Sequence, residues 1–141
     1  MRTVTNMRLF PEDARARFAN ARVARFATVN ADGAPHLVPV TFAVHGDEIV
    51  FAVDHKPKST TALRRLENIA ERPAVCFLAD AYDEDWSQLW WARADGVARI
   101  VDDPAGPIQW LQAKYPQYQD NPPHDAIVVT TVHTWRGWSA T

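Results

Sequence analysis

Two of the three lysines in the sequence stand in one short turn, Lys56-Pro57-Lys58-Ser59-Thr60. A lysine ammonium is a compact charge that suits phosphate, and Ser59 is a favourable N-cap for a helix that would follow it. A helix starting here would add free backbone N–H groups that point toward an anion. The turn therefore predicts a phosphate-binding corner, and a solvated loop is the alternative interpretation.

Three predicted strands lead to this corner, over residues 22–29, 34–44 and 48–53. They are rich in Val, Thr and Phe, and the turns between them, Asn30 to Gly33 and His45 to Asp47, contain Gly, which typically supplies a positive φ. The pattern predicts a three-stranded antiparallel meander. Pro39 interrupts the second strand because proline has no amide hydrogen to donate. It predicts a sheet edge, a bulge, or a backbone segment that faces a ligand.

The rest of the chain alternates short helices and strands without a regular βαβ repeat. The predicted helices cover 11–21, 59–71 and 108–115, and the predicted strands cover 74–79, 89–101, with a bulge at Asp95-Gly96, and 126–135. We expect an irregular loop over 116–123. About six strands with two or three short helices indicate a mainly β (α+β) fold, an antiparallel barrel rather than a doubly wound sheet.

Composition narrows the class of protein. A chain of 141 residues, 47% of them hydrophobic, predicts one domain over 1–141. The formal net charge of −2 gives no basic field for nucleic acid, so small molecules are the expected partners. Cys76 is the single cysteine, and neither a signal peptide nor a membrane-spanning run is visible, so we expect a cytoplasmic protein with no membrane span.

No metal site or acid–base pair stands out. The acidic run from Asp80 to Asp85 lacks the ligand and glycine spacing of a calcium loop, and the five histidines lack metal-ligand spacing. The serines lack the glycine pattern of a nucleophile elbow. We predict no metal and identify no catalytic residue, although His36 and Tyr82 are candidates for a proton donor.

Trp90 and Trp91 are adjacent on a predicted strand, so their side chains must point to opposite faces of the sheet. One indole therefore leaves the core of the domain. An exposed Trp is typical of an interface or of a site for a flat ligand, and we expect a homodimer.

Three segments carry a family resemblance: RVARFATVNADGAPHLVPVTF, KPKSTTALRRLENIAERPAVCFLAD and YDEDWSQLWWARADGVARIV. They resemble the pyridoxamine 5′-phosphate oxidase-like split β-barrel superfamily. More narrowly, they are similar to its small actinobacterial coenzyme F420-dependent oxidoreductases. The arginine and histidine pattern that binds substrate in pyridoxamine phosphate oxidase itself is not found near the C-terminus, so vitamin B6 oxidation is not expected.

The resemblance implies a six-stranded FMN-binding split barrel that dimerises, with two cofactor sites at the subunit interface. It implies a flavin-type ring against the second and third strands and a phosphate at the basic turn. The implied roles are ring contacts for Val38, Pro39, Val40, Thr41, Phe51, Ala52 and Val53, phosphate contacts for Lys56, Lys58, Ser59 and Thr60, and a wall from the partner subunit for Trp90, Trp135 and Trp138.

The implied activity is hydride transfer from reduced F420, a deazaflavin, to an unsaturated small organic acceptor. F420 carries an extended anionic tail, for which Arg64 and Arg65 of the following predicted helix are candidate partners; the alternative is that they form the solvated face of that helix. Two alternatives stay open: an FMN-dependent oxidoreductase on the same fold, and a non-catalytic protein that binds a cofactor or ligand.

Overall fold

The computed structural model describes residues 7–53, 60–123 and 126–141. In this part of the chain, eight strands form one antiparallel sheet: β1 (Met7–Arg8), β2 (Ala24–Val29), β3 (Pro35–Val40), β4 (Ala43–His45), β5 (Glu48–Ala52), β6 (Ala74–Ala81), β7 (Trp90–Ile100) and β8 (Ile127–Ser139). The helices are α1 (Pro11–Asn20), α2 (Thr60–Glu71), α3 (Ala105–Lys114) and α4 (Gln117–Asp120), with a 3₁₀ turn at Trp86–Gln88. None of the helices in these segments is long and apolar enough to cross a bilayer.

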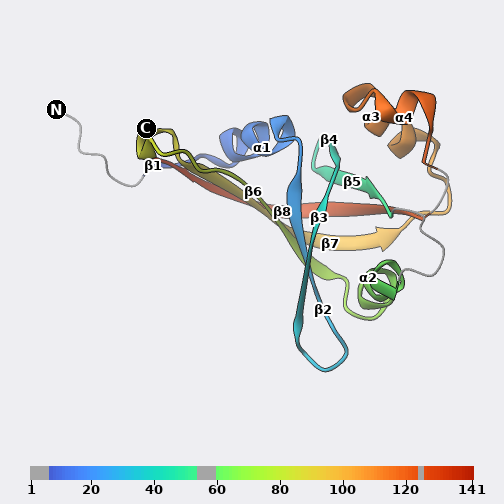
Figure 1. The fold of residues 1–141 in the computed structure, drawn as a ribbon. Coiled ribbons are helices and arrows are strands. Elements are labelled where there is room, and N and C mark those ends of the chain that lie inside the picture. Colours follow the sequence, from blue (N-terminus) through green and yellow to red (C-terminus); the bar gives the residue numbers. More distant parts are fainter. Residues whose placement is uncertain (1–6, 54–59, 124–125) are drawn as a thin grey trace.

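The strand order requires the sheet to curl. Neighbouring strands run β3-β2-β6-β7-β8-β5-β4, and β1 pairs with β8. The two ends of this order, β3 and β4, are joined by only Thr41 and Phe42 in the chain. So short a link brings the two end strands together, which gives the split β-barrel that the sequence predicts. Figure 1 shows the strongly twisted sheet, with α1 beside β8 toward the C-terminus and α3 and α4 at the other end of the long strands.

The predicted meander is wrong in one respect: the segment 34–44 is not one strand between two partners. Its first part, β3, pairs with β2, and its second part, β4, pairs with β5, whereas the other partner of β5 is β8. The amide of Phe42 at the break donates to the Tyr115 hydroxyl at 3.1 Å. A side chain thus satisfies a backbone group that a continuous strand would pair in the ladder.

The split of this segment, together with the two-residue β1, gives eight strands where six were expected. The described residues form four α-helices where two or three were expected, because Pro116 leads into the short helix α4 within the predicted loop. Other local predictions are confirmed. Proline stands at the first position of α1, the pairing of β7 with β8 shifts register between Asp95 and Gly96, and Pro39 lies on β3, at one end of the strand order.

A group of phenylalanine side chains lies within the barrel interior, among alanine, valine and isoleucine. Phe18, Phe26, Phe42, Phe51 and Phe77 are all fully buried. The Phe26 ring lies 4.7 Å from that of Phe77 and 4.8 Å from that of Phe51, between ring centroids. Such tilted contacts add to the stability gained from burying each ring. The core thus packs β2, β5 and β6 against one another, and β2 and β5 in turn pair with β3 and β4.

Candidate functional site

A cavity of about 460 Å³ opens where β3 and β5 end. It is lined by Val38, Pro39, Val40, Thr41, Ala52, Arg65 and Tyr118, and we call it the β3 pocket. Five of the seven residues that the resemblance assigns to a ring are therefore gathered in one cavity, with a cation from α2 and a phenol from α4. The fold brings these residues together from distant parts of the sequence. β3 ends at Val40, Ala52 lies 12 positions after it, and Tyr118 lies 78 positions after it.

The position of β3 explains why a ligand can approach its backbone. β3 is an end strand of the sheet, so alternate N–H and C=O groups point away from β2. Pro39 has no N–H, which suits such an edge. Beyond the strand, the Thr41 hydroxyl lies 3.1 Å from the Tyr118 hydroxyl. The pocket therefore combines an apolar strand surface with a pair of hydroxyl groups.

His36 lies on the same strand and carries a buried polar atom without a partner among the described residues. It alternates with Val38 and Val40 on the less exposed side of β3. Its buried Nδ1 has no hydrogen-bond partner in the described part of the chain. Burial lowers the pKa of His36, and the charges of Arg64 and Arg65 lower the pKa further. The charged form of the imidazole is therefore disfavoured, and two α2 guanidinium groups lie close enough to act on it.

The placement of α2 depends on a buried amide. Asn68 is 3% exposed, and its Nδ2 donates to Thr28 Oγ1 at 3.0 Å and to Asn30 Oδ1 at 2.9 Å. Arg72 Nε donates to the Val29 carbonyl at 3.0 Å. These bonds tie α2 to the C-terminal end of β2. β2 is the strand that pairs with β3.

The remaining predicted site residues lie elsewhere. Phe51 and Val53 face the hydrophobic core and do not line the β3 pocket. Trp135 is 9% exposed, packs on Phe18, and donates from Nε1 to Asp47 Oδ1 at 3.3 Å. Half-buried Trp90 has the Arg17 guanidinium 5.8 Å from its ring centroid.

The predicted phosphate corner stays a prediction. Lys56, Lys58 and Ser59 lie outside the described residues, and Thr60 is described only as the first residue of α2. Since β5 ends at Ala52 and α2 carries Arg65, the elements on both sides of this segment contribute to the β3 pocket.

Tyr118 is the pocket residue that sequence reasoning missed. It stands in a stretch with prolines that predicts an irregular loop, and no motif marks it. Its role is visible only once α4 packs against the end of β3.

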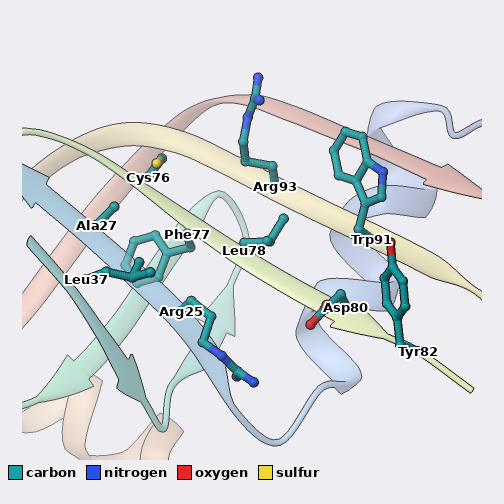
Figure 2. Close-up of a pocket in the computed structure, with 10 residues that line it drawn as sticks. All are labelled: Arg25, Ala27, Leu37, Cys76, Phe77, Leu78, Asp80, Tyr82, Trp91 and Arg93. Atoms are coloured by element: carbon teal, nitrogen blue, oxygen red, sulfur yellow. The ribbon is translucent and has the colours of Figure 1, made fainter. Parts of the chain in front are cut away.

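A second hollow, of about 510 Å³, lies on the outer face of β2, β6 and β7. Figure 2 shows its lining, with Trp91 and Arg93 projecting from the same side of β7. Exposed apolar side chains contribute to it, including Leu37 at 65% exposure and Tyr82 at 76%. Cys76 also lines it, and burial raises the pKa of this thiol, as does Asp95, so the reactive thiolate is disfavoured.

Comparison with known proteins assigns the family. The family model of pyridoxamine 5′-phosphate oxidase matches residues 10–139, nearly the whole chain. The chain therefore belongs to the pyridoxamine 5′-phosphate oxidase family. No functionally curated protein matches it in sequence.

Solved structures share the fold at low sequence identity. A FAD-binding protein from Mesorhizobium loti aligns with a TM-score of 0.73 and 16% identity, over 96% of this chain and 99% of that one. The FAD-binding protein from Mycobacterium smegmatis gives 0.65 and 19%, over 95% and 97%. A haem-binding protein from Mycobacterium smegmatis gives 0.72 and 20%, over 92% of this chain and 53% of that one.

Proposed function

We propose that this protein is an oxidoreductase that binds coenzyme F420 with its deazaflavin ring in the β3 pocket and passes hydride to an unsaturated small organic acceptor. The observation that carries the proposal is the meeting of Val38, Pro39, Val40 and Thr41 with Ala52 in one cavity. Family membership and the FAD-binding proteins of the same fold support a flavin-type ring.

The residues present fit such a ring. A planar heterocycle has two apolar faces and a polar edge, and the pocket offers valine and proline side chains together with strand backbone, two hydroxyls and a guanidinium. When bound, the cofactor would supply the hydride, while these residues would bind and orient the ring and exclude water.

The charges beside the pocket favour F420 over a cofactor with a short tail. Arg64 and Arg65 act on His36, and Arg65 lines the pocket itself. Lys56 and Lys58 come immediately before α2 in the sequence. Up to four cationic side chains would thus bind the phosphate and the anionic tail of F420. A single phosphate group requires fewer cations than this.

A flavin enzyme is the second candidate. Two proteins of this fold are described as FAD-binding, which favours a flavin over a deazaflavin. The haem-binding protein of the same fold keeps a non-catalytic binding role open. In all three cases we place the ligand in the β3 pocket and expect the protein in the cytoplasm.

We further propose that the protein is a homodimer with cofactor sites at the interface. The outer hollow in Figure 2 supports this, because exposed Leu37, Leu78 and Tyr82 form an apolar surface on the sheet. Light scattering during size-exclusion chromatography tests this proposal, and a monomeric mass at micromolar concentration would refute it.

The testing experiment is a titration of the purified protein with F420, FMN and FAD, followed by tryptophan quenching. We expect F420 to bind most tightly and reduced F420 to be consumed with an acceptor panel of conjugated carbonyls and imines. Tighter binding of FMN or FAD would favour the flavin enzyme. Binding of F420 without any turnover would favour the carrier.

Two variants test whether the predicted phosphate-binding corner and Arg65 belong to the cofactor site. Lys58→Ala should weaken F420 binding at least tenfold, or about 1.4 kcal/mol, while the fold stays intact. Arg65→Gln should weaken it similarly. Arg15→Gln, which removes a cation of α1 that pairs with Asp47, is the matched control and should leave the dissociation constant unchanged. An unchanged constant for both Lys58→Ala and Arg65→Gln would remove this corner from the site.

A further inference from the structure

Lys114, the last residue of α3, lies among groups from three other parts of the chain. Its Nζ is 3.7 Å from the centre of the Phe42 ring and 5.3 Å from that of the Tyr115 ring. The same atom donates to the Ala21 carbonyl oxygen at 2.6 Å. We call Ala21, Phe42 and Tyr115 the lysine cage. None of these residues lines the β3 pocket or the outer hollow of the sheet, so the proposed cofactor site and dimer surface do not use them.

The lysine cage gives the ammonium group no carboxylate. In the part of the chain that the structure describes, no ion pair involves Lys114. A nearby charged group is instead a cation, Arg22, whose guanidinium donates to the Lys114 backbone carbonyl at 3.2 Å and lies 5.1 Å from the centre of the Tyr115 ring. Burial, and to a smaller extent the Arg22 charge, lowers the pKa of Lys114 to about 8. A substantial share of this side chain is therefore uncharged amine near neutral pH, whereas an ordinary lysine is almost entirely ammonium there.

An uncharged amine in this position can react with a small electrophile. It carries the lone pair that attacks an electron-poor carbon, and desolvation or a neighbouring cation is a common means of activating a lysine. Lys114 is half-buried and not sealed in the core, so Nζ can be reached from solvent. The fully buried Phe42 ring closes one side of Nζ, which favours a reagent of few atoms.

We propose that Lys114 forms a carbamate with carbon dioxide and that Arg22 is the counter-ion of this carbamate. The uncharged Nζ attacks the carbon of CO2, an N–C bond forms, one C=O π bond breaks, and Nζ releases one proton to water. The reaction needs no oxidant or reductant. The product keeps one N–H, which can still donate to the Ala21 carbonyl oxygen.

The charges around Lys114 favour this product. Before the reaction, the ammonium and the Arg22 guanidinium are two cations near each other, and each disfavours the other. After the reaction, Lys114 carries a planar anion with two oxygens, which a guanidinium binds well. Arg22 is exposed, so its side chain is free to turn toward that anion.

The test is chemical trapping of the carbamate in cofactor-free protein at about pH 8 with carbon-13 bicarbonate. Triethyloxonium converts a carbamate to a stable ethyl ester, and peptide mapping by mass spectrometry locates the label. The chain has three lysines, so Lys56 and Lys58 are internal references. We expect at least tenfold more label on Lys114 than on either of them.

Two arginine variants test the counter-ion. Arg22→Gln should lower the label on Lys114 at least threefold, because it removes both the partner of the carbamate and a charge that favours the uncharged amine. Arg15→Gln removes a cation of α1 that pairs with Asp47 and should change the label less than 1.5-fold. An equal effect of the two variants would overturn the assignment of Arg22.

Carbon-13 NMR gives a second readout without trapping. We expect a carbamate resonance that is present in the wild type and absent from Lys114→Met, while any resonance of the α-amino carbamate stays the same. No label on Lys114, or equal label on all three lysines, would overturn the proposal. Because these experiments use protein without cofactor, their outcome is independent of the proposed activity.

Discussion

The Thr41 hydroxyl lies 3.1 Å from the Tyr118 hydroxyl, which joins the break between β3 and β4 to helix α4. Both residues line the β3 pocket, so this contact shapes the proposed cofactor site from two distant parts of the sequence. Tyr115 on the neighbouring turn reinforces the same junction, since its hydroxyl accepts from the Phe42 amide at 3.1 Å and donates to the Arg22 carbonyl at 2.8 Å.

Removing either hydroxyl should weaken cofactor binding modestly. We expect Tyr118→Phe and Thr41→Val each to weaken F420 binding by about 0.5–1.5 kcal/mol, the usual net value of one hydrogen bond. Since the two groups are in contact, the double variant should lose less than the sum of the two single effects. Fluorescence titration of all four proteins measures this coupling, and strict additivity would mean that the two hydroxyls act independently.

Asn68 should control both stability and the position of α2. Asn68→Leu leaves Thr28 Oγ1 and Asn30 Oδ1 without their amide donor, so we expect a loss of about 1–3 kcal/mol in the free energy of unfolding. Glu67→Gln changes an exposed neighbour on the same helix and should alter stability by less than about 0.5 kcal/mol. Urea denaturation of both variants tests this, and equal stabilities would contradict the anchoring role.

Gly96 should not tolerate a side chain. A Cβ at this position would lie 2.4 Å from the Thr131 carbonyl oxygen and 2.8 Å from Thr130 Cγ2. We expect Gly96→Ala to destabilise the protein by at least about 1–3 kcal/mol, because backbone must move at the bulge between β7 and β8. Thermal unfolding followed by circular dichroism gives the measurement.

Gly106 in α3 provides the contrasting variant. Its nearest neighbour to an added Cβ is Trp110 at 3.8 Å, an ordinary contact distance. Gly106→Ala should therefore leave stability unchanged or increase it by up to about 1 kcal/mol, since alanine favours helix. A loss as large as that of Gly96→Ala would show that the space around each glycine is not what decides the effect.

Lys114 should make stability depend on pH. Its Nζ donates to the Ala21 carbonyl at 2.6 Å and lies 3.7 Å from the centre of the Phe42 ring. Burial, with a smaller effect of the nearby Arg22 charge, lowers the pKa of Lys114 from 10.5 to about 8. Above pH 8 the folded protein therefore releases a proton that the unfolded chain keeps up to about pH 10.5, so the contribution of Lys114 to stability increases between these two values.

Lys114→Met isolates this contribution, because the other titrating groups are common to both proteins. We expect the free energy of unfolding of the wild type, minus that of Lys114→Met, to be greater at about pH 9.5 than at about pH 7.5. Urea titrations at the two pH values give this difference. A difference that is constant or falls with pH would mean that the folded state does not disfavour the charged lysine.

The sequence alone determined most of the local structure. The Gly-containing turns, the proline at the start of α1, the helical spacing of α2 and the bulge at Asp95-Gly96 are set by backbone preferences of nearby residues, so they can be predicted without a fold. The mainly β class and the membership of the pyridoxamine 5′-phosphate oxidase family were also evident in the order of these motifs.

The tertiary structure decided which of these elements meet. Pro39 signals an irregularity in residues 34–44, but it does not show that the strand breaks at Thr41, where the Phe42 amide donates to Tyr115, 73 positions away. Likewise, Tyr118 in the β3 pocket and the contact of Lys114 with Phe42 could not be found from motifs. Contacts between distant residues depend on how the sheet closes and on its register, and both are set by packing of the whole core rather than by any one segment.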